Sequence, residues 1–393
     1  MIFIDKFNIF ILHFGIIVNT LMIKNEEVVL RKRSALNTKQ IKTNEWINWC
    51  LDSETMKEIN VLNLKQAFES IEFMSCLLFV EYDTCDQSSE EQMLIFKYDK
   101  NIKTIDLEID PKQNVNGFYK MTIGKRCNES KRCLLRKILS FLGLILNTKR
   151  ADRDNFIKVN ESNIDPFYLK NFVIDNNADT ANTSYDYGSI MQLSNFEFRN
   201  GMKRTFKIKP SHYEVMLGQG YGLSFTDIKL LNIRYCKASC IDNDMAKNVK
   251  CKNGGIINPY SCANCICPNM FAADKFCEKM DPSDSSCPSS EFNATSKKTK
   301  LVIKGKKRCN IKIIAKEGKK ILITVKKAVL SAIYPCFEGL GLEVKYRKDK
   351  TLTGLILCVI PESVSIVSED ETVLLQYNGE QNNHIAIIEY QMK

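Results

Sequence analysis

The stretch that decides the fold is "RKILSFLGLILNTKRADRDN", Arg136 to Asn155. Its first half is intensely apolar and predicts a helix over about residues 131–146. Gly143 interrupts the apolar run, and glycine lets a chain turn sharply because it has no Cβ. The second half, from Lys149 onward, is dense in charge. A helix, a break and a charged return are therefore expected here.

The cysteines indicate an oxidising compartment. The chain has 16 of them, all after residue 49, and six fall between Cys240 and Cys277. Cytosolic chains rarely hold so many without zinc spacing, and only "CANCIC" (262–267) comes close to a zinc-type CxxC pair. We therefore predict disulfides rather than metal. A segment as short as 240–277 cannot bury its own core and needs such cross-links.

The first residues predict secretion. "FNIFILHFGIIV" (Phe7 to Val18) has the length of a signal-peptide core and is shorter than the roughly 20 residues of a membrane span. A buried strand is the alternative. "RKRSA" (Arg31 to Ala35) fits a processing site and an exposed basic turn equally well. We predict a signal peptide and short pro-segment over 1–33, and no membrane span.

Apolar periodicity predicts three further regions. The run 61–72 predicts a helix, and "CLLFVEY", "MLIFKY", "TIDLEI" and "YKMTIG" predict strands, so residues 34–236 are expected to form an α+β domain. A disulfide-rich segment at 237–280 and a linker at 281–286 follow. Seven short alternating runs then predict an antiparallel β-sandwich over 287–393.

Four motifs, in order along the chain, carry a resemblance. They are "KRADRDNFIKVN" (149–160), "YDYGSIMQLS" (185–194) with Met191, "GQGYGLSFTDIKLLNIRYC" (218–236) and "CKNGG" (251–255) with the cysteines after it. Together they resemble the astacin zinc metalloendopeptidases, in the layout of protease domain, EGF-like module and CUB domain. The resemblance implies a metzincin-like protease domain at 34–236, an EGF-like module at 237–280 and a CUB-like sandwich at 287–393.

The family signature, HExxHxxGxxHExxRxDRD with a later methionine turn SxMHY, implies the site positions. With Gly143 and Arg150 in register, the metal ligand positions are occupied by Arg136, Ser140, Leu146 and, at the methionine turn, Leu193; the general-base position is Lys137. Zinc requires several lone-pair donors. Leucine has none, serine is a poor ligand, and the two cations oppose a metal ion.

The histidine count gives a second argument. The chain holds His13, His212 and His384, so the domain at 34–236 has one histidine and cannot form a three-histidine site. His212 lies in "KPSHYE", where a surface histidine is expected. Cys133 could serve a substitute metal site, although a buried thiol or disulfide is favoured. We predict no bound cofactor and no intact catalytic residue, although the family cofactor is zinc.

These residues predict a secreted, inactive protease homologue that binds an extracellular protein or peptide. A decaying duplicate without selected activity is an equal alternative. The opposing classes are an active zinc metalloendopeptidase and an adhesion protein. For adhesion, Lys297–Lys327 carries 13 Lys or Arg against the single acid Glu317, and strand alternation would place many on one face suited to anionic glycans. Nucleic acid is not expected for a secreted chain.

Arg136 is the residue expected to replace the metal. We predict that it points into a cleft that is still open and pairs there with water or with an acid, Asp152, Asp154 or Asp186. In the alternative, it rotates outward and Leu135, Leu139, Leu142 and Leu146 fill the pocket.

The resemblance also implies covalent features. The disulfides are Cys76–Cys236, Cys85–Cys127, Cys240–Cys262, Cys251–Cys265, Cys267–Cys277, Cys287–Cys309 and Cys336–Cys358. Cys50 and Cys133 are left over, either to pair with each other or to stay free. Sequons at Asn128, Asn160, Asn182 and Asn293 predict glycosylation.

Overall fold

The structure is a computed structural model. It describes residues 46–85, 93–102, 114–115, 118–178, 180–241, 243–360 and 362–393, which belong to one compact unit, Arg33–Lys393. The expected leader and pro-segment, and the strand expected in "TIDLEI", lie outside the described residues. Within that described part of the chain, no helix is both long and apolar enough to cross a membrane.

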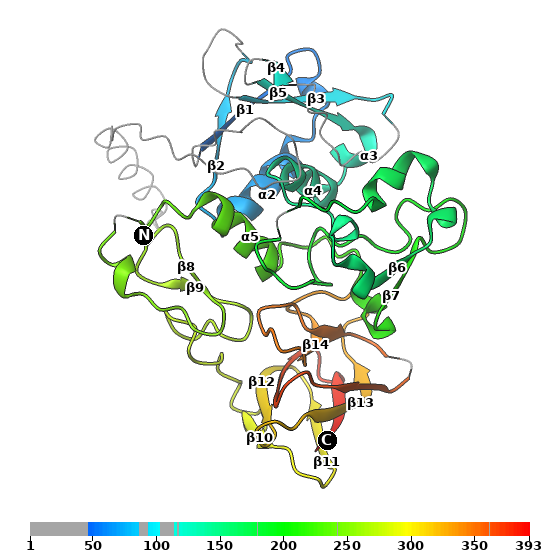
Figure 1. The fold of residues 1–393 in the computed structure, drawn as a ribbon, viewed down its shortest axis with the longest axis vertical. Helices are drawn as coiled ribbons and strands as arrows, with labels where there is room; N and C mark the ends of the chain where they lie inside the picture. The colour runs from blue at the N-terminus through cyan, green and yellow to red at the C-terminus, as the bar shows by residue number, and fades with distance from the viewer. Residues whose placement is uncertain are drawn as a thin grey trace, which may run out of the picture. The chain divides into compact units, whose positions relative to one another are not determined.

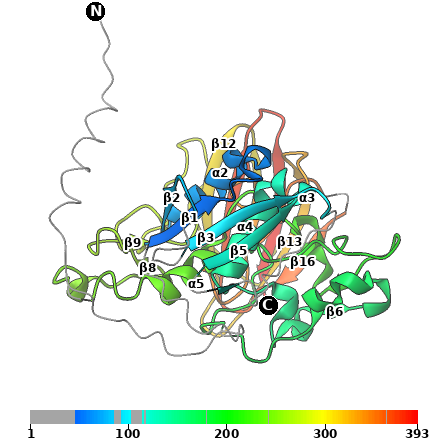
Figure 2. The ribbon, with the colours of Figure 1, turned by 90° about the horizontal axis from the view of Figure 1, so that it is seen from above.

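A five-stranded sheet opens the N-terminal region, residues 46–236. Its order is β2-β1-β3-β5-β4; β4 runs antiparallel to β5 at one edge, and the other pairings are parallel. Seen from above, β1, β3 and β5 lie side by side (Figure 2). The strands are β1 (Trp46–Leu51), β2 (Leu78–Tyr82), β3 (Met93–Asp99), β4 (Asn114–Val115) and β5 (Phe118–Gly124).

Two neighbouring helices, α2 and α4, lie on one face of this sheet (Figure 1). Helix α2 (Val61–Glu72) has the predicted bounds, and its Phe68 ring lies 5.1 Å from the Trp49 ring of β1. Helix α4 (Lys131–Phe141) ends at Phe141 rather than Leu146, because the chain turns at Gly143. Helix α5 (Phe225–Tyr235) closes the region, and the Cys76–Cys236 disulfide ties its end to the segment after α2.

Short elements connect these helices. Strands β6 (Ile157–Val159) and β7 (Phe206–Ile208) pair antiparallel. The short helices are η2 (Met56–Glu58), α3 (Lys125–Asn128), η4 (Asn147–Lys149), η5 (Arg153–Asn155), η6 (Glu161–Asn163), η7 (Pro166–Phe172) and η8 (Ser211–Met216).

Residues 237–280 form a small segment held by three disulfides. It contains η9 (Ala246–Asn248) and one antiparallel strand pair, β8 (Ile256–Ile257) with β9 (Cys265–Ile266). In "CKNGG", Asn253 and Gly254 both have positive φ, as the tight turn requires. The three disulfides therefore stabilise this segment, which has too few residues to bury a large apolar core.

Two sheets that share a buried core form the C-terminal region. One has the order β10-β12-β17-β14-β15 and the other β11-β18-β13-β16. The expected antiparallel pairing holds except at one edge, where β10 runs parallel to β12. The strands are β10 (Glu291–Asn293), β11 (Thr299–Lys304), β12 (Lys307–Ile314), β13 (Ile321–Val329), β14 (Gly341–Lys345), β15 (Leu355–Leu357), β16 (Val364–Val367), β17 (Thr372–Gly379) and β18 (Ile385–Met392).

All 16 cysteines lie within the described residues and are bonded. The Cys85–Cys127 pair is wrong, and so is the expectation that Cys50 and Cys133 are left over. Cys85 is bonded to Cys50 of β1, and Cys127 of α3 to Cys133 in the first turn of α4, only six residues on. The other six bonds are those expected: Cys76–Cys236, Cys240–Cys262, Cys251–Cys265, Cys267–Cys277, Cys287–Cys309 and Cys336–Cys358.

Candidate functional site

A sharp turn at Gly143 ends helix α4, as the sequence predicts. Its φ is +82°, and a Cβ there would lie 2.3 Å from the Arg234 guanidinium. Glycine avoids both the backbone strain and the collision. The chain then returns to the methionine turn, residues 189–193, where the Asn147 amide donates to the Met191 carbonyl at 3.1 Å. Helix, break and return are all present.

One buried carboxylate, Asp227, anchors the methionine turn. It accepts hydrogen bonds from the Ser189 hydroxyl (2.6 Å) and the Ile190 amide (2.9 Å). The same carboxylate forms the capping box of α5 with Ser224. Burial raises the pKa of the Asp227 carboxyl to about 6, and the Ser189 hydrogen bond is the largest opposing effect. The turn and α5 are thereby fixed to each other.

The Arg136 side chain reaches from α4 to the methionine turn. Its Nε donates to the Ile190 carbonyl at 2.6 Å, and its two terminal nitrogens donate to the Gln192 carbonyl at 2.7 Å and to Glu197 Oε1 at 2.8 Å. Only 2% of the side chain is exposed. Each of the three guanidinium nitrogens therefore has an acceptor, and one of these acceptors is a carboxylate that balances the buried charge.

Glu197 is the counter-ion of this buried arginine. Its second carboxylate oxygen accepts from the Ser194 amide at 2.7 Å, and an Arg132 nitrogen lies 3.6 Å from the first. Burial lowers the pKa of Arg136, and attraction to Glu197 is the main opposing effect. Arginine does not lose its proton in proteins, so the site holds a positive charge.

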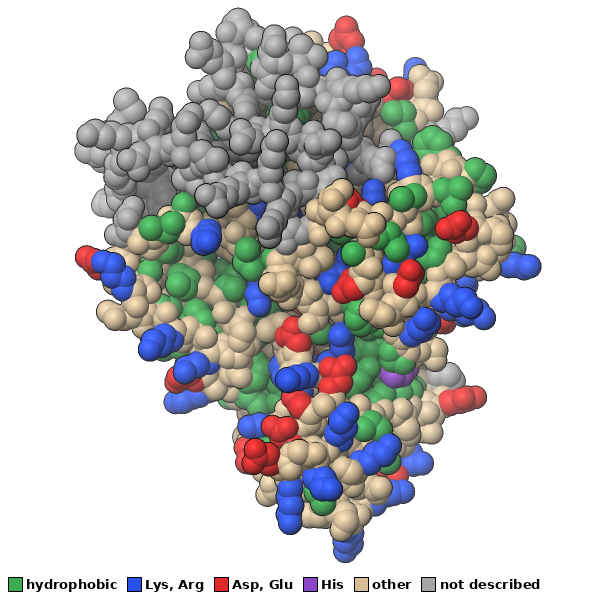
Figure 3. All heavy atoms as spheres, in the orientation of Figure 1, with side chains coloured by type: hydrophobic (Ala, Val, Ile, Leu, Met, Phe, Trp, Pro, Cys, Tyr) green, Lys and Arg blue, Asp and Glu red, His purple; other side chains and the backbone are tan. Residues whose placement is uncertain are grey.

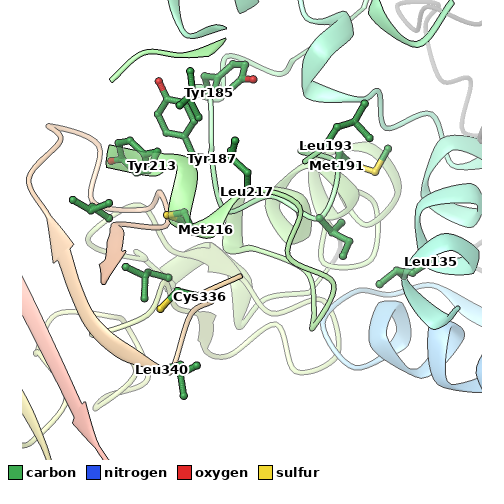
Figure 4. Close-up of a cluster of buried hydrophobic side chains, with 14 of the residues drawn as sticks. Leu135, Tyr185, Tyr187, Met191, Leu193, Tyr213, Met216, Leu217, Cys336 and Leu340 are labelled. Atoms are coloured by element: carbon green, nitrogen blue, oxygen red, sulfur yellow. The ribbon is translucent and has the colours of Figure 1, made fainter. Parts of the chain in front are cut away.

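The other signature positions supply little to a metal. Leu146 and Leu193 are buried, and Figure 4 shows Leu193 beside Met191 among buried hydrophobic side chains. Ser140 is half-buried, and Lys137, at the general-base position, is 5% exposed. In the part of the chain that the structure describes, no group of three His, Cys, Asp or Glu could hold a metal ion. The residues present do not fit zinc, which binds through such side chains.

The predicted direction of Arg136 is right, but its predicted surroundings are wrong. It points inward, yet it is buried rather than in an open cleft, and its acid is Glu197. The three acids that were expected have other partners, since Asp152 binds Arg150, Asp154 binds Arg153, and Asp186 accepts from the Gly188 amide and Thr353.

The predicted alternative, an outward rotation of Arg136, is also wrong. The four leucines that it invoked are nevertheless buried: Leu135, Leu139, Leu142 and Leu146. A paired guanidinium and an apolar surround therefore occupy this region together.

Sequence reasoning missed Glu197 and Asp227. The spacing of Ser224 and Asp227 is that of a capping box before an apolar run, so this signal was present in the sequence. Nothing in "SNFEF" (194–198) marks Glu197, because its role depends on an arginine 61 residues earlier in the chain.

Two further predicted sites change. The Asn128 side chain is buried, accepts from the Asn60 amide and donates to the Glu58 carbonyl, so a glycan there does not fit the structure. His212 is half-buried rather than on the surface, with Nε2 3.2 Å from the Tyr346 hydroxyl, and burial lowers its pKa to about 4. Asn160, Asn182 and Asn293 are exposed, and glycosylation there stays a prediction.

Comparison with known proteins agrees with this scaffold of helix, glycine break and methionine turn. The model of the peptidase family Astacin matches residues 36–236. The chain therefore belongs to the astacin family. It resembles the zinc metalloproteinases nas-34 (29% identical over 261 residues, 66% of this chain and 42% of that protein) and nas-31 (30% over 260 residues, 62% and 40%), both of Caenorhabditis elegans.

The chain spans about two fifths of the length of these two relatives. Among solved structures, High choriolytic enzyme 1, a hatching-enzyme zinc protease from Oryzias latipes, is similar at 21% identity and a TM-score of 0.40, over 48% of this chain and 88% of that chain.

Proposed function

We propose that this chain is an astacin-family protein without zinc peptidase activity that acts by binding an extracellular protein or peptide. One observation carries the first half of the proposal. The Arg136 guanidinium bonds to two methionine-turn carbonyls and to Glu197, so a buried cation lies where the family signature places its first zinc ligand.

Charge and donor chemistry both support inactivity. A dication near Arg136 would meet two arginines, Arg132 and Arg136, that share the single carboxylate of Glu197, so the nearby charge is positive on balance. The four ligand positions offer one hydroxyl, that of Ser140, against the three or more donors that zinc needs. At the base position, Lys137 replaces the glutamate of the family signature, so the carboxylate that would accept a proton from water is missing.

The edges of the N-terminal sheet support the second half of the proposal, the binding of a protein or peptide. In the family, substrate lies extended along an edge strand through main-chain hydrogen bonds, a mode that needs no metal. The sheet is retained, with β4 at one edge and β2 at the other. Because Arg136 is buried and paired, we place recognition at the sheet edge and not at the metal position.

The rest of the proposal concerns context. We infer that 237–280 is an EGF-like module, supported by the order of its three disulfides, and that 287–393 is a CUB-like domain, supported by two sheets and two disulfides. Eight disulfides and the apolar run 7–18 support secretion. An active zinc endopeptidase is the alternative that the relatives' names favour.

A gain-of-function variant tests inactivity. The chain carrying R136H, K137E, S140H and L146H is compared with the natural chain for bound zinc and for gelatin cleavage. We expect neither property in the natural chain and recovered zinc in the variant, since the turn at Gly143 remains. Cleavage by the natural chain that a chelator abolishes would refute the proposal.

Competition tests binding. An active astacin-family enzyme digests a limiting protein substrate while the natural chain is added. If the natural chain binds the substrate, digestion should slow in proportion to the fraction of substrate that it holds. Excess substrate should then restore the rate. An unchanged rate with every substrate class tried, collagenous and non-collagenous, would contradict a substrate-binding role.

A further inference from the structure

Strand alternation predicts that many basic residues of 297–327 lie on one sheet face. In the structure they are not gathered there. Outward positions of β11 and β13 carry only four of them, and Lys307, Arg308 and Lys312 lie on the other sheet. Five of the others lie at one end of the two sheets. We call it the lysine end, and it consists of Lys297, Lys298, Lys316, Lys319 and Lys320, all exposed.

Main-chain hydrogen bonds hold the segments of the lysine end together. The Lys319 amide closes a turn on the Lys316 carbonyl at 3.0 Å, and Lys320 exchanges two bonds with Lys393. The Met392 amide donates to the Thr295 carbonyl at 2.7 Å, two residues before Lys297. The lysines therefore project from a fixed backbone. Figure 3 shows Lys and Arg side chains gathered at the lower tip, where Figure 1 places β10, β11 and the C-terminus.

Acids near this charge are fewer than its lysines. Glu317 is the one acid within 295–298 and 316–320, and Glu389 of β18 lies 3.8 Å from Lys298. The run 369–371 adjoins the end, since the Ala315 amide donates to the Glu371 carbonyl, but Glu369 and Asp370 pair with Arg347 and Lys350 outside it. Segments 295–298 and 316–320 also expose no large hydrophobic side chain. Membrane insertion and ordinary protein interfaces need apolar contact. A partner read by charge alone fits this surface better.

We propose that the lysine end binds a linear sulfated polysaccharide of the heparin type. This inference rests on the proposed secretion, which eight disulfides support, and sulfated polyanions of this kind occur outside the cell. Lysine ammonium groups act as point charges and suit sulfates of variable spacing. Binding releases counterions from the polyanion, as known for nucleic acids, so it weakens steeply with salt. This site is independent of the protease-like region.

The test compares two triple variants of the full chain. K316Q/K319Q/K320Q removes three charges from the lysine end, and K237Q/K250Q/K252Q removes three exposed lysines from elsewhere. At 150 mM salt we expect the first to bind a heparin oligosaccharide about 10-fold more weakly, on about 0.5 kcal/mol per exposed charge contact. The control should stay within about twofold of the natural chain.

Three outcomes overturn the proposal. The first is an equal loss of affinity in both variants, which would mean general attraction to the net charge of +10. The second is no loss of affinity in either variant. The third is undiminished affinity for desulfated heparin. Capture by phosphatidylserine vesicles in place of heparin, with the same lysine dependence, would assign the surface to membranes instead. K297Q/K298Q repeats the test if the first variant lowers the thermal midpoint of unfolding.

Discussion

The backbone frame of the candidate site and its ligand positions differ in what they keep of the family signature. The frame keeps Gly143 with its left-handed φ and the methionine turn held by Asp227. The ligand positions keep no histidine, and one of them holds the buried Arg136. The two parts meet at the Ile190 and Gln192 carbonyls, to which Arg136 donates.

This difference teaches that the frame does not depend on a metal. Hydrogen bonds that the turn donates to the Asp227 carboxylate, and one that it accepts from the Asn147 amide, fix the turn on one side. The guanidinium of Arg136 donates to its Ile190 and Gln192 carbonyls on the other. Each bond lies within the protein and forms on folding. On the proposed function, loss of the ligands removes zinc chemistry from the site while its backbone arrangement remains.

Arg136→Met should have the largest effect on stability. It keeps an unbranched side chain but leaves Glu197, 15% exposed, without its main partner and two carbonyls without donors. We expect a loss of about 3–5 kcal/mol in the free energy of unfolding. Arg132→Met, at a 36% exposed side chain, should cost under about 1 kcal/mol.

A double variant sharpens this test. In R136M/E197Q the uncompensated carboxylate is gone, so the loss should be smaller than the sum of the two single losses. Urea unfolding of the natural chain, R136M, E197Q and R136M/E197Q measures the single losses and the loss in the double variant. Equal costs for Arg132→Met and Arg136→Met would contradict the structural role of Arg136.

The pH dependence of stability tests the Asp227 anchor. Its pKa is about 6 in the folded chain against an ordinary 3.8, so between these values the folded state binds more protons than the unfolded state. The free energy of unfolding should therefore fall by about 3 kcal/mol as pH rises from about 3 to 7, with about 2 kcal/mol of the fall between pH 4 and 6. Asp227→Asn should lack this fall, whereas Asp154→Asn, at a 67% exposed side chain, should keep it.

Gly143→Ala should have an intermediate effect. Gly201 has the same φ of +82° but open space around it, so Gly201→Ala measures backbone strain alone, about 1 kcal/mol. At Gly143 the new methyl group also displaces the Arg234 guanidinium from the Leu142 carbonyl, for a total of about 2 kcal/mol. Identical thermal midpoints for the two variants would contradict this packing.

Ser140→Ala should have the smallest effect. Ser140 occupies a ligand position, and on the proposed function its half-buried hydroxyl has no ligand role, so the change should stay within about 0.5 kcal/mol. Leu139→Ala, one residue earlier and buried, should cost about 2–5 kcal/mol. A large loss at Ser140 would show that this position has a role that the structure does not explain.

Local patterns predicted much of the fold. Helix α2 has the bounds that apolar spacing gives, and most strands of the C-terminal sheets fall within the predicted runs. Strands β1, β4, β6, β7, β10 and β16 were missed, because runs of two to six residues show little alternation. Helix α4 was drawn too long, since apolar residues continue past Gly143 although the backbone turns there.

The candidate site was predictable only in part. Motif register gave the positions of Arg136, Lys137, Ser140, Leu146 and Leu193, and the inward direction of Arg136. Its partner, Glu197, and its burial depend on folding that brings distant segments together. The Cys85–Cys127 error has the same cause, since spacing does not say which nearby thiols meet.

Metal analysis of the purified natural chain tests the central claim most directly. After dialysis against buffer containing micromolar zinc, the chain is measured by mass spectrometry of its metals, beside the chain carrying R136H, K137E, S140H and L146H. We predict well under one tenth of a zinc ion per natural chain, because Arg136 and two leucines occupy the ligand positions. One zinc per natural chain, removed by chelator and lost in Ser140→Ala, would contradict the account.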